Sequence, residues 1–287
     1  MSKLTIGLLH TMIRGDERLL IEAAKQRVCT LNVVDVREQI FDPTDFSSTY
    51  DAVLERCVST VKGTHAVEFY ESMGVIAVNS LKVSRICENK FTTSLVLVNH
   101  HVSTPRFALV FAEAQAKEAI EELGGYPVVI KPISGSWGRL LARVNDEDAL
   151  EALIEQKMML GGPHHQAIYL QKYVEKPGRD IRINVIGGRV VAAIYRMSDH
   201  WITNTARGAQ AQPCSVDADL EKIAQKAAAA IGEGIFGIDV FETKEGYVVN
   251  EINHTTEFKN VQRVTGIDVA GAMIDYCISR AKKSKRL

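Results

Sequence analysis

The 287-residue sequence is 46% hydrophobic and 24% charged, an ordinary globular composition with enough length for one large or two to three smaller packed units. The formal net charge of −1 gives no support for nucleic-acid or anionic-membrane binding, and no apolar run approaches the length of a membrane-spanning helix. The 5 cysteines are dispersed without a CxxC pair, which argues against a disulfide framework or a zinc site and predicts reduced thiols in a cytoplasmic protein.

The first 88 residues alternate apolar strand patterns with helical ones, which predicts a small open α/β domain with a parallel sheet. Strands are expected at residues 4–10, 31–36, 52–54 and 75–78, with helices at 14–28 and 61–73. We expect this domain to be a scaffold without catalytic residues. Arg56 follows a strand and could contact a ligand there, but a surface salt bridge is the favoured interpretation.

The middle of the chain predicts a second unit built around a loop of small residues. Elements are expected as a helix at 80–100, a strand at 106–110, a helix at 112–123, strands at 128–132 and 140–144, and a helix that Asp146 caps. The loop at 133–139 would let backbone amides approach phosphate oxygens, with Lys131 at its root. It matches neither GxxxxGK[ST] nor GxGxxG, and a tight turn would also use Gly135 and Gly138.

The last part of the chain combines strands with polar loops. The pattern predicts a strand at 168–174, a hairpin turning at Gly187-Gly188, a polar and aromatic binding loop at 198–208, helices at 216–231 and 269–280, and a polar loop at 254–261. Arg182 and Arg196 fall at strand positions, where a cation either covers the sheet or holds an anion.

Residues 235–253 form the most informative stretch, two apolar strands joined by a polar turn with Gly246. A turn centred on Lys244 would place Asp239 opposite Val249 and diagonal to Glu251. Asn253 shares the face of Glu251, so two carboxylates and an amide oxygen could converge on Mg²⁺. The same residues could be solvent-facing polar positions, but an acid amid such apolar strands favours the metal site.

Taken together, several motifs in order resemble those of the ATP-grasp superfamily. They are Lys90, Lys131-Pro132, the loop Gly135–Arg139, Gln171-Lys-Tyr-Val174, Arg179-Asp-Ile-Arg182, Asp239 and Glu251-Ile-Asn253. The resemblance implies an α/β protein with the ATP-grasp fold, in which two lobes clasp ATP. Its expected divisions are a pre-ATP-grasp domain at 1–88, a central lobe at 89–170 and a C-terminal lobe at 171–287.

The resemblance also implies roles for individual residues around ATP and Mg²⁺. Lys90 and Lys131 would contact phosphates under the closing loop Gly135, Ser136, Trp137, Gly138 and Arg139, and the backbone of Gln171, Lys172, Tyr173 and Val174 would contact adenine. Arg179, Asp180, Arg182 and Asn204 would complete the nucleotide site, and Asp239, Glu251 and Asn253 would hold Mg²⁺. Arg182 or Arg196 would be catalytic by holding an acyl phosphate. The substrate set would be Arg196, His200, Asn204, Thr205, Thr255, Glu257, Phe258, Lys259 and Asn260.

Within the superfamily, the sequence is most similar to the LysX family of ligases, through four stretches. These are Ser134-Gly-Ser-Trp-Gly-Arg139, Lys176-Pro-Gly-Arg-Asp-Ile-Arg182, His200-Trp-Ile-Thr-Asn-Thr-Ala-Arg-Gly208 and Val249-Asn-Glu-Ile-Asn-His254 followed by Glu257-Phe-Lys-Asn260. The similarity implies that 2-aminoadipate is joined to LysW, a small acidic carrier protein, by a homodimer or homotetramer. Lys259, Arg263 and the basic C-terminal tail are candidates for docking that carrier.

Three alternatives remain open at this stage. Val261 stands where a small hydroxyl residue is expected, so the substrate could be glutamate, or both glutamate and 2-aminoadipate. The loop from His200 to Asn204 favours 2-aminoadipate. A second enzymatic alternative is a ligase that adds glutamate to another protein terminus. A third is an ATP-binding regulatory module without chemistry, which the joint presence of the lysines and metal ligands disfavours.

Overall fold

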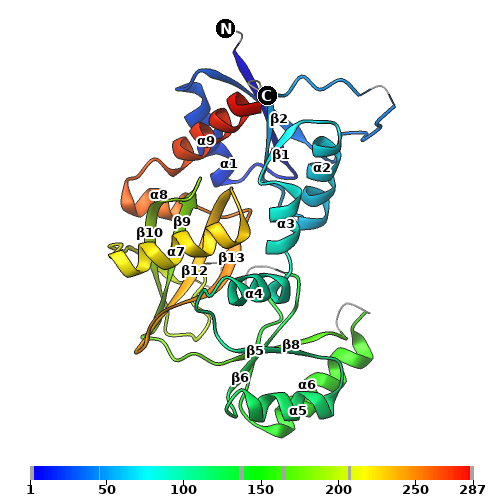
Figure 1. The fold of residues 1–287 in the computed structure, drawn as a ribbon, viewed down its shortest axis with the longest axis vertical. Helices are drawn as coiled ribbons and strands as arrows, with labels where there is room; N and C mark the ends of the chain where they lie inside the picture. The colour runs from blue at the N-terminus through cyan, green and yellow to red at the C-terminus, as the bar shows by residue number, and fades with distance from the viewer. Residues whose placement is uncertain (1–2, 45, 136–138, 163–165, 206–207, 285–287) are drawn as a thin grey trace.

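The computed structural model describes residues 3–44, 46–135, 139–162, 166–205 and 208–284, and its strands form three sheets along the long axis of the molecule (Figure 1). The first sheet is parallel and the other two are antiparallel. The third sheet lies between the first and the second in space (Figure 1). The chain therefore forms the first sheet at one end of the molecule, the second at the other end, and then the third between them.

The first unit is a parallel sheet with helices on both faces. Its elements are β1 (Leu4–His10), α1 (Gly15–Lys25), β2 (Cys29–Asp35), β3 (Ala52–Glu55), α2 (Thr60–Ser72), β4 (Ile76–Val78) and α3 (Leu81–Cys87). The strand order is β2-β1-β3-β4. Strand β1 is a nearly continuous apolar run because it is covered twice, by α1 on one face and by α2 on the other.

The second unit is an antiparallel sheet with two helices on one face. Its elements are α4 (Lys90–Asn99), β5 (Phe107–Val110), α5 (Glu113–Glu122), β6 (Val128–Lys131), β7 (Ala142–Val144), α6 (Glu147–Leu160) and β8 (Ile168–Lys172). The strand order is β5-β8-β6-β7, and α5 and α6 bury their apolar sides against it. Its opposite face is free to contribute Val129, Lys131 and Gln171 to a cavity.

The third unit is a five-stranded antiparallel sheet with one apolar and one polar face. Its elements are β9 (Arg179–Ile186), β10 (Arg189–Met197), β11 (Gln210–Pro213), α7 (Ala218–Ile231), β12 (Ile235–Thr243), β13 (Gly246–Asn253), α8 (Lys259–Thr265) and α9 (Val269–Ser284). Along β9, Ile181, Ile183 and Val185 pack under α7, whereas Asp180 and Arg182 alternate to the other face. Strand alternation thus separates the hydrophobic core from the charged residues.

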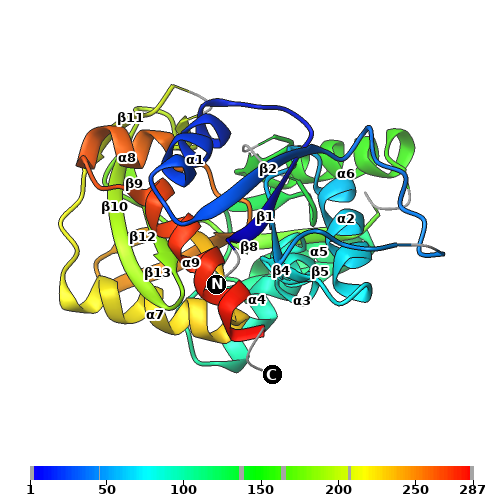
Figure 2. The same ribbon diagram turned by 90° about the horizontal axis from the view of Figure 1, so that it is seen from above.

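The last helix returns to the first unit. Helix α9 lies beside α1 at the end of the molecule that holds β1, as both ribbon views show (Figures 1 and 2). Met273, Ile274 and Cys277 are fully buried in a core that also contains Ile6 from β1 and Ile194 from β10. One continuous core therefore joins the first and third units.

Most of the expected elements are present, and three parts of the chain differ from the expectation. The helix expected at 80–100 is two helices, because Asn89 accepts a hydrogen bond from the Thr92 amide at 3.0 Å and so begins α4. Residues Lys259–Thr265 form α8, which overlaps the end of the loop expected at 254–261, and β11 pairs with β10 just after the loop expected at 198–208. Within the described ranges, no helix is both long and apolar enough to cross a membrane.

Candidate active site

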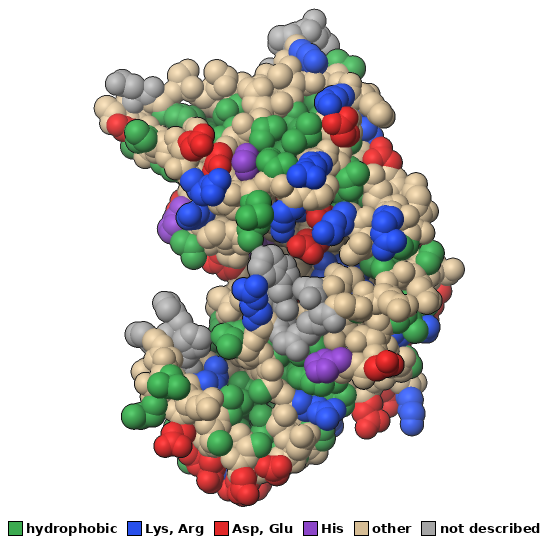
Figure 3. Space-filling view, turned by 180° about the vertical axis from the view of Figure 1, so that it is seen from behind, with side chains coloured by type: hydrophobic (Ala, Val, Ile, Leu, Met, Phe, Trp, Pro, Cys, Tyr) green, Lys and Arg blue, Asp and Glu red, His purple; other side chains and the backbone are tan. Residues whose placement is uncertain are grey.

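A cavity of about 620 Å³ lies where the three units meet. Figure 3 shows the molecule hollowed on this side, with acidic and basic side chains around the hollow. Many of the predicted site residues line it: Lys131, Gly135, Gln171, Lys172, Tyr173, Val174, Asp180, Arg182, Arg196, Asn204, Thr205, Asp239, Glu251, Asn253, Thr255, Glu257, Lys259 and Asn260. The fold thus gathers residues from distant parts of the sequence on one enclosed space.

The β12–β13 hairpin places Asp239 directly opposite Glu251. The predicted diagonal arrangement, with Asp239 opposite Val249, is therefore wrong. The turn lies between Thr243 and Gly246, and a bulge shifts the register between Asp239 and Val240, so that Val240 faces Val249 instead. The bulge brings the two carboxylate-bearing residues closer in register than the regular hairpin would.

Asp239 lies in a buried network of ion pairs with two arginines. Arg182 donates to both of its carboxylate oxygens, with the Nη2–Oδ2 distance at 3.1 Å, and Arg196 Nη2 lies 3.0 Å from Oδ2. Arg196 also donates to both oxygens of Asp180 at 2.6 Å. Two positive and two negative groups therefore neutralise one another on the polar face of the sheet.

The network fixes the protonation states of its members. Burial alone would raise the pKa of Asp239, but the charges of Arg182 and Arg196 outweigh it and lower that pKa. Burial alone would lower the pKa of Arg196, and Asp239 and Asp180 raise it instead. Asp239 is therefore an anion held at a fixed place, as a metal ligand or an anchor for a catalytic arginine must be.

The ammonium groups of Lys131 and Lys90 lie in the cavity or contact residues that line it. Lys131 Nζ donates to Asn250 Oδ1 at 2.8 Å, and Lys90 Nζ lies 3.2 Å from Glu251 Oε1 and donates to the Gly135 carbonyl at 2.6 Å. Burial lowers the pKa of Lys131 to about 8, and the charge of Glu251 offsets only part of that effect. Lys131 is thus a buried cation whose own protein partners do not fully compensate it, as expected of a group that binds an anionic ligand.

Lys176 is a site residue that the sequence prediction omitted. Its Nζ donates to Thr203 Oγ1 at 2.7 Å and lies 4.8 Å from the centre of the Phe241 ring. Burial also lowers its pKa. The turn Lys176-Pro-Gly178, which aims this side chain back over β12, was the signal that could have identified it.

The chain segment after β8 provides a narrow, mixed surface beside Lys131. Gln171 is buried, and the amides of Lys172 and Tyr173 donate to the carbonyls of Arg106 and Pro127 at 2.8 and 3.4 Å. The amide of Val174 has no partner within the described part of the chain. Of the backbone donors predicted to contact adenine, Val174 is therefore the one left free.

Several predicted residues lie elsewhere. Arg179 is held by Glu242 at 2.6 and 2.9 Å and stacks on Tyr195, so it faces away from the cavity. His200 caps its own loop by accepting from the Ile202 amide at 3.0 Å, and it does not line the cavity. Arg139 is exposed outside the cavity lining, and Ser136, Trp137 and Gly138 lie outside the described residues.

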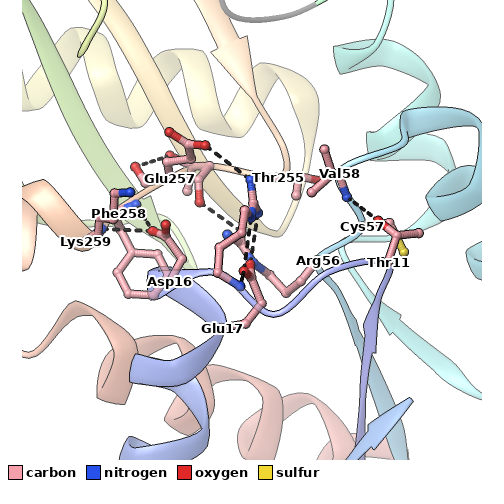
Figure 4. Close-up of polar contacts among 12 residues, drawn as sticks. Thr11, Asp16, Glu17, Arg56, Cys57, Val58, Thr255, Glu257, Phe258 and Lys259 are labelled. Carbon is pink, nitrogen blue, oxygen red and sulfur yellow. Dashed lines mark hydrogen bonds and ion pairs between the residues drawn. The ribbon is translucent and has the colours of Figure 1, made fainter. Parts of the chain in front are cut away.

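The expectation that Phe258 contacts substrate is wrong, because its ring is fully buried in the core. The salt bridge favoured for Arg56 is present, but its expected place on the surface is wrong. Its side chain is 2% exposed, pairs with Glu17 at 3.2 Å and donates to the Thr256 carbonyl at 2.8 Å. The guanidinium lies 5.7 Å from the centre of the Phe258 ring. Both residues therefore join the first unit to the loop that follows β13 (Figure 4).

The first unit also contributes to the cavity, against the expectation that it is only a scaffold. Arg14, Ser59 and Thr60 line the cavity from the start of α1 and the start of α2. No sequence motif marks them, since each is an ordinary residue near a helix start. Their role arises from the way the first unit packs beside the loop after β13.

The donor atoms on β12 and β13 fit a divalent metal ion. Asp239, Glu251 and Asn253 all line the cavity, and the Asn253 amide nitrogen donates to the Gly237 carbonyl at 3.4 Å, which leaves its oxygen as the possible ligand. Two carboxylates and an amide oxygen suit Mg²⁺, whose remaining ligands are usually phosphate and water. Among the described residues there is no separate cluster of three or more His, Cys, Asp or Glu that could hold a metal.

Comparison with known proteins identifies relatives over nearly the whole chain. Residues 6–86 match the LysX preATP-grasp domain, and residues 87–277 match the RimK-like ATP-grasp domain. The alpha-aminoadipate–LysW ligase LysX of Saccharolobus solfataricus is 35% identical over 95% of this chain and 100% of that protein. The glutamate–LysW ligase ArgX of Sulfolobus acidocaldarius is 29% identical over 94% and 97%. A RimK domain ATP-grasp protein from Sphaerobacter thermophilus has a TM-score of 0.81 and 27% identity, covering 96% of this chain and 99% of that one.

Proposed function

The chain belongs to the RimK-like ATP-grasp family, and from that premise we propose that it joins 2-aminoadipate to the carrier protein LysW. The protein is an ATP-dependent amino-acid ligase of the ATP-grasp type. The proposed bond links the α-amino group of 2-aminoadipate to the side-chain carboxylate of the carrier's C-terminal glutamate. Similarity to both the LysX and ArgX ligases supports the carrier.

The observation that carries this proposal is the convergence of Asp239, Glu251 and Lys131 on one cavity. The two carboxylates are opposite each other across β12 and β13, and the buried lysine donates to Asn250 on the same strand as Glu251. A cavity that combines fixed anions with a buried cation that is only partly compensated suits a nucleoside triphosphate bound with Mg²⁺. ATP and Mg²⁺ are used throughout the ATP-grasp family to which the chain belongs.

The first step transfers a phosphoryl group. An oxygen of the carrier carboxylate attacks the γ-phosphorus of ATP, the bond to the β-phosphate oxygen breaks, and acyl phosphate and ADP result. Lys131 and Lys90 would hold phosphate oxygens in line for this transfer. Mg²⁺ held by Asp239, Glu251 and Asn253 would reduce the negative charge on the transferring group.

The second step forms the amide. The unprotonated α-amine attacks the acyl carbon, the C–N bond forms, the C–O bond to phosphate breaks, and the amine loses a proton. Arg182 would hold the acyl phosphate: it lines the cavity, and its contacts to Asp239 and, through Nη1 at 3.3 Å, to Thr256 fix its orientation. Arg196, only 5% exposed, would contribute indirectly by holding Asp239 in place.

The amino acid in this proposal is 2-aminoadipate. The loop from His200 to Asn204 supports it, since Trp201, Ile202 and Asn204 contribute to the cavity wall. Val261 is the residue at which the sequence departs from the expected LysX pattern, and it is 1% exposed beside Asn260. A larger or smaller side chain at position 261 would therefore change the shape of the cavity wall.

The arrangement of the three sheets supports the proposed division into an N-terminal domain at 1–88, a central lobe at 89–170 and a C-terminal lobe at 171–287. In this assignment the central lobe supplies Lys131 and Gln171 and closes over the nucleotide. Closure would keep water from the acyl phosphate.

The test is amide formation with purified protein, ATP, Mg²⁺ and the LysW carrier. We expect ADP release that requires both carrier and 2-aminoadipate, and a carrier mass increase equal to one 2-aminoadipate residue. Turnover with glutamate alone would place the protein with the ArgX-type ligases and make Val261 the first residue to exchange. Turnover with neither amino acid would contradict the proposed carrier.

A further inference from the structure

A cluster of charged residues lies where the loop after β13 meets the first unit (Figure 4). Arg14 Nη1 lies 3.2 Å from Glu257 Oε1, and the two side chains are 18% and 35% exposed. Both residues line the cavity. This cation and anion are therefore adjacent to each other and to the space in which substrates react.

Arg14 is held in place from behind. Its Nε and Nη2 donate to the two oxygens of Glu17 at 3.1 and 2.9 Å. Glu17 is fully buried and also accepts from Arg56 Nε at 3.2 Å. One carboxylate thus serves two guanidinium groups, which leaves the Nη1 side of Arg14 directed at Glu257 and the cavity.

Lys259 brings a second cation to the same place. A Cβ atom on Gly15, the neighbour of Arg14, would lie 3.3 Å from Lys259 Cδ, so the lysine stem crosses the start of α1. The amides of Phe258 and Lys259 donate to Asp16 Oδ1 at 2.6 and 2.9 Å, which fixes the backbone from which the side chain extends. Lys259 also lines the cavity.

The Arg14–Glu257 pair is not required to hold the loop. Asn79 donates to the His254 carbonyl at 2.7 Å, Arg56 donates to the Thr256 carbonyl at 2.8 Å, and Asp16 accepts from two loop amides. These contacts fix the backbone on both sides of Glu257. A partly exposed ion pair adds little stability to a loop whose backbone these contacts already fix.

We infer that Arg14, Lys259 and Glu257 form the subsite that recognises the free acidic amino acid, an inference that rests on the proposed ligase function. The two cations receive the two carboxylates, and Glu257 receives the ammonium. The amino acid replaces the partly exposed contact between Arg14 and Glu257 with two contacts of the same kind. Glu17 and Arg56 act as positioning residues for Arg14.

The Arg14–Glu257 pair can distinguish the free amino acid from the carrier, although both substrates have carboxylates. The C-terminal residue of the carrier has carboxylates, but its nitrogen is in a peptide bond, so it offers no ammonium to Glu257. The free amino acid has both groups. The subsite lines the same cavity as the proposed metal ligands, and Glu257 comes four positions after Asn253, a stretch that an extended chain spans in at most about 14 Å.

The test is calorimetric titration of L-2-aminoadipate, L-glutamate and adipate into the protein with ADP and Mg²⁺. Arg14→Gln and Glu257→Gln are each expected to weaken binding of the amino acid about 10- to 100-fold, the usual range for losing a charged hydrogen bond. Adipate lacks the amino group, so Glu257→Gln should also reduce the preference of the protein for 2-aminoadipate over adipate. Lys259→Gln should weaken both ligands together.

Arg27→Gln is the matched control. Arg27 is 17% exposed and, like Arg14, joins the first unit to the C-terminal part of the chain, through Asp268 at 3.0 Å and Asp275 at 2.8 Å. It does not line the cavity. Its loss should leave amino-acid affinity within about twofold of wild type, while thermal unfolding of all variants reports any loss of stability. Glu257→Gln alters a loop side chain and tests the inference even if Arg14→Gln folds poorly.

The outcomes separate this inference from the proposed function. Wild-type protein that binds neither amino acid, or variants that bind both with wild-type affinity and wild-type preference over adipate, would overturn the subsite. Amino-acid binding that depends on Arg14 and Glu257, in a protein that never modifies LysW, would support the subsite and contradict the carrier. Normal carrier modification by Glu257→Gln at an unchanged KM for 2-aminoadipate would support the carrier and contradict the subsite.

Discussion

Lys131→Met should make the protein more stable while weakening its binding of ATP. Lys131 is 5% exposed at the end of β6, and burial lowers its pKa from 10.5 to about 8. That difference corresponds to about 3 kcal/mol of unfavourable free energy for the folded ammonium at neutral pH. Methionine has a similar length and no charge, so it avoids this cost.

The substitution also removes the hydrogen bond from Nζ to Asn250 Oδ1. Asn250 is only partly buried and lines the cavity, so water can replace part of that contact. We therefore expect a net gain of about 1–2 kcal/mol in the free energy of unfolding near pH 7. The same change should weaken ATP binding by about 10- to 100-fold, because a charged contact to phosphate is lost.

The dependence on pH identifies the cause. Between pH 8 and 10.5 the unfolded chain holds a proton on Lys131 that the folded protein has lost. The stability of the wild type must therefore rise with pH through this window, relative to that of the variant. The advantage of Lys131→Met should be fully present below pH 8 and lost as the pH approaches 10.5.

Urea unfolding of both proteins near pH 7 and near pH 10 measures this difference, since contributions from other titrating groups cancel between them. Titration with ATP and Mg²⁺ provides the accompanying change in affinity. A variant that is less stable than wild type near pH 7, or a stability difference that does not change with pH, would refute the argument that the buried ammonium is uncompensated.

Three further changes test other parts of the site. Asp239→Asn leaves buried guanidinium charge without its partner and should lower the free energy of unfolding by about 3–5 kcal/mol in urea titrations; an unchanged midpoint would contradict the buried network. Glu251→Gln breaks a partly exposed ion pair and should change stability by less than about 1 kcal/mol, yet raise the Mg²⁺ concentration for half-maximal ADP release at least about tenfold. Gly237→Ala would place a methyl carbon 2.7 Å from Thr256 Cβ and should cost about 1–3 kcal/mol, whereas Gly162→Ala, with no atom of the described residues within 4 Å, should unfold at the wild-type midpoint.

The elements that could be predicted from the sequence are those with strong local signals. Alternating apolar strands and helices predicted the parallel first sheet, and Gly187-Gly188 and Gly246 predicted hairpins that the structure contains. Asp239 could be proposed as a site residue because it interrupts an otherwise apolar strand, and Lys131 because it ends such a strand at the root of a loop of small residues. A charged residue in that position needs a compensating contact, and this requirement is visible without coordinates.

The features that were missed depend on contacts between distant residues. The bulge beside Asp239 places this residue opposite Glu251, whereas the regular register set by the turn would place it opposite Asn250, and the spacing of residues in a hairpin does not reveal a bulge. Arg56 pairs with Glu17 and with a carbonyl 200 residues away, so nothing near it in the sequence distinguishes it from a surface arginine. Helix α8 begins where Asp16 accepts the amides of Phe258 and Lys259, a cap supplied from the other end of the chain.

The first unit therefore does more than support the nucleotide-binding units. Arg56, Asp16 and Asn79 all bind the backbone of the loop after β13, and residues 254–257 of that loop line the cavity. The hairpin that carries Asp239 and Glu251 leads directly into this loop, so the proposed metal ligands and the proposed amino-acid subsite are parts of one continuous segment. If the proposed subsite is correct, changes in the first unit would alter which amino acid is accepted without altering the residues proposed to bind phosphate. Two ligases of this fold could share their ATP chemistry and differ in amino acid through residues that the first unit positions.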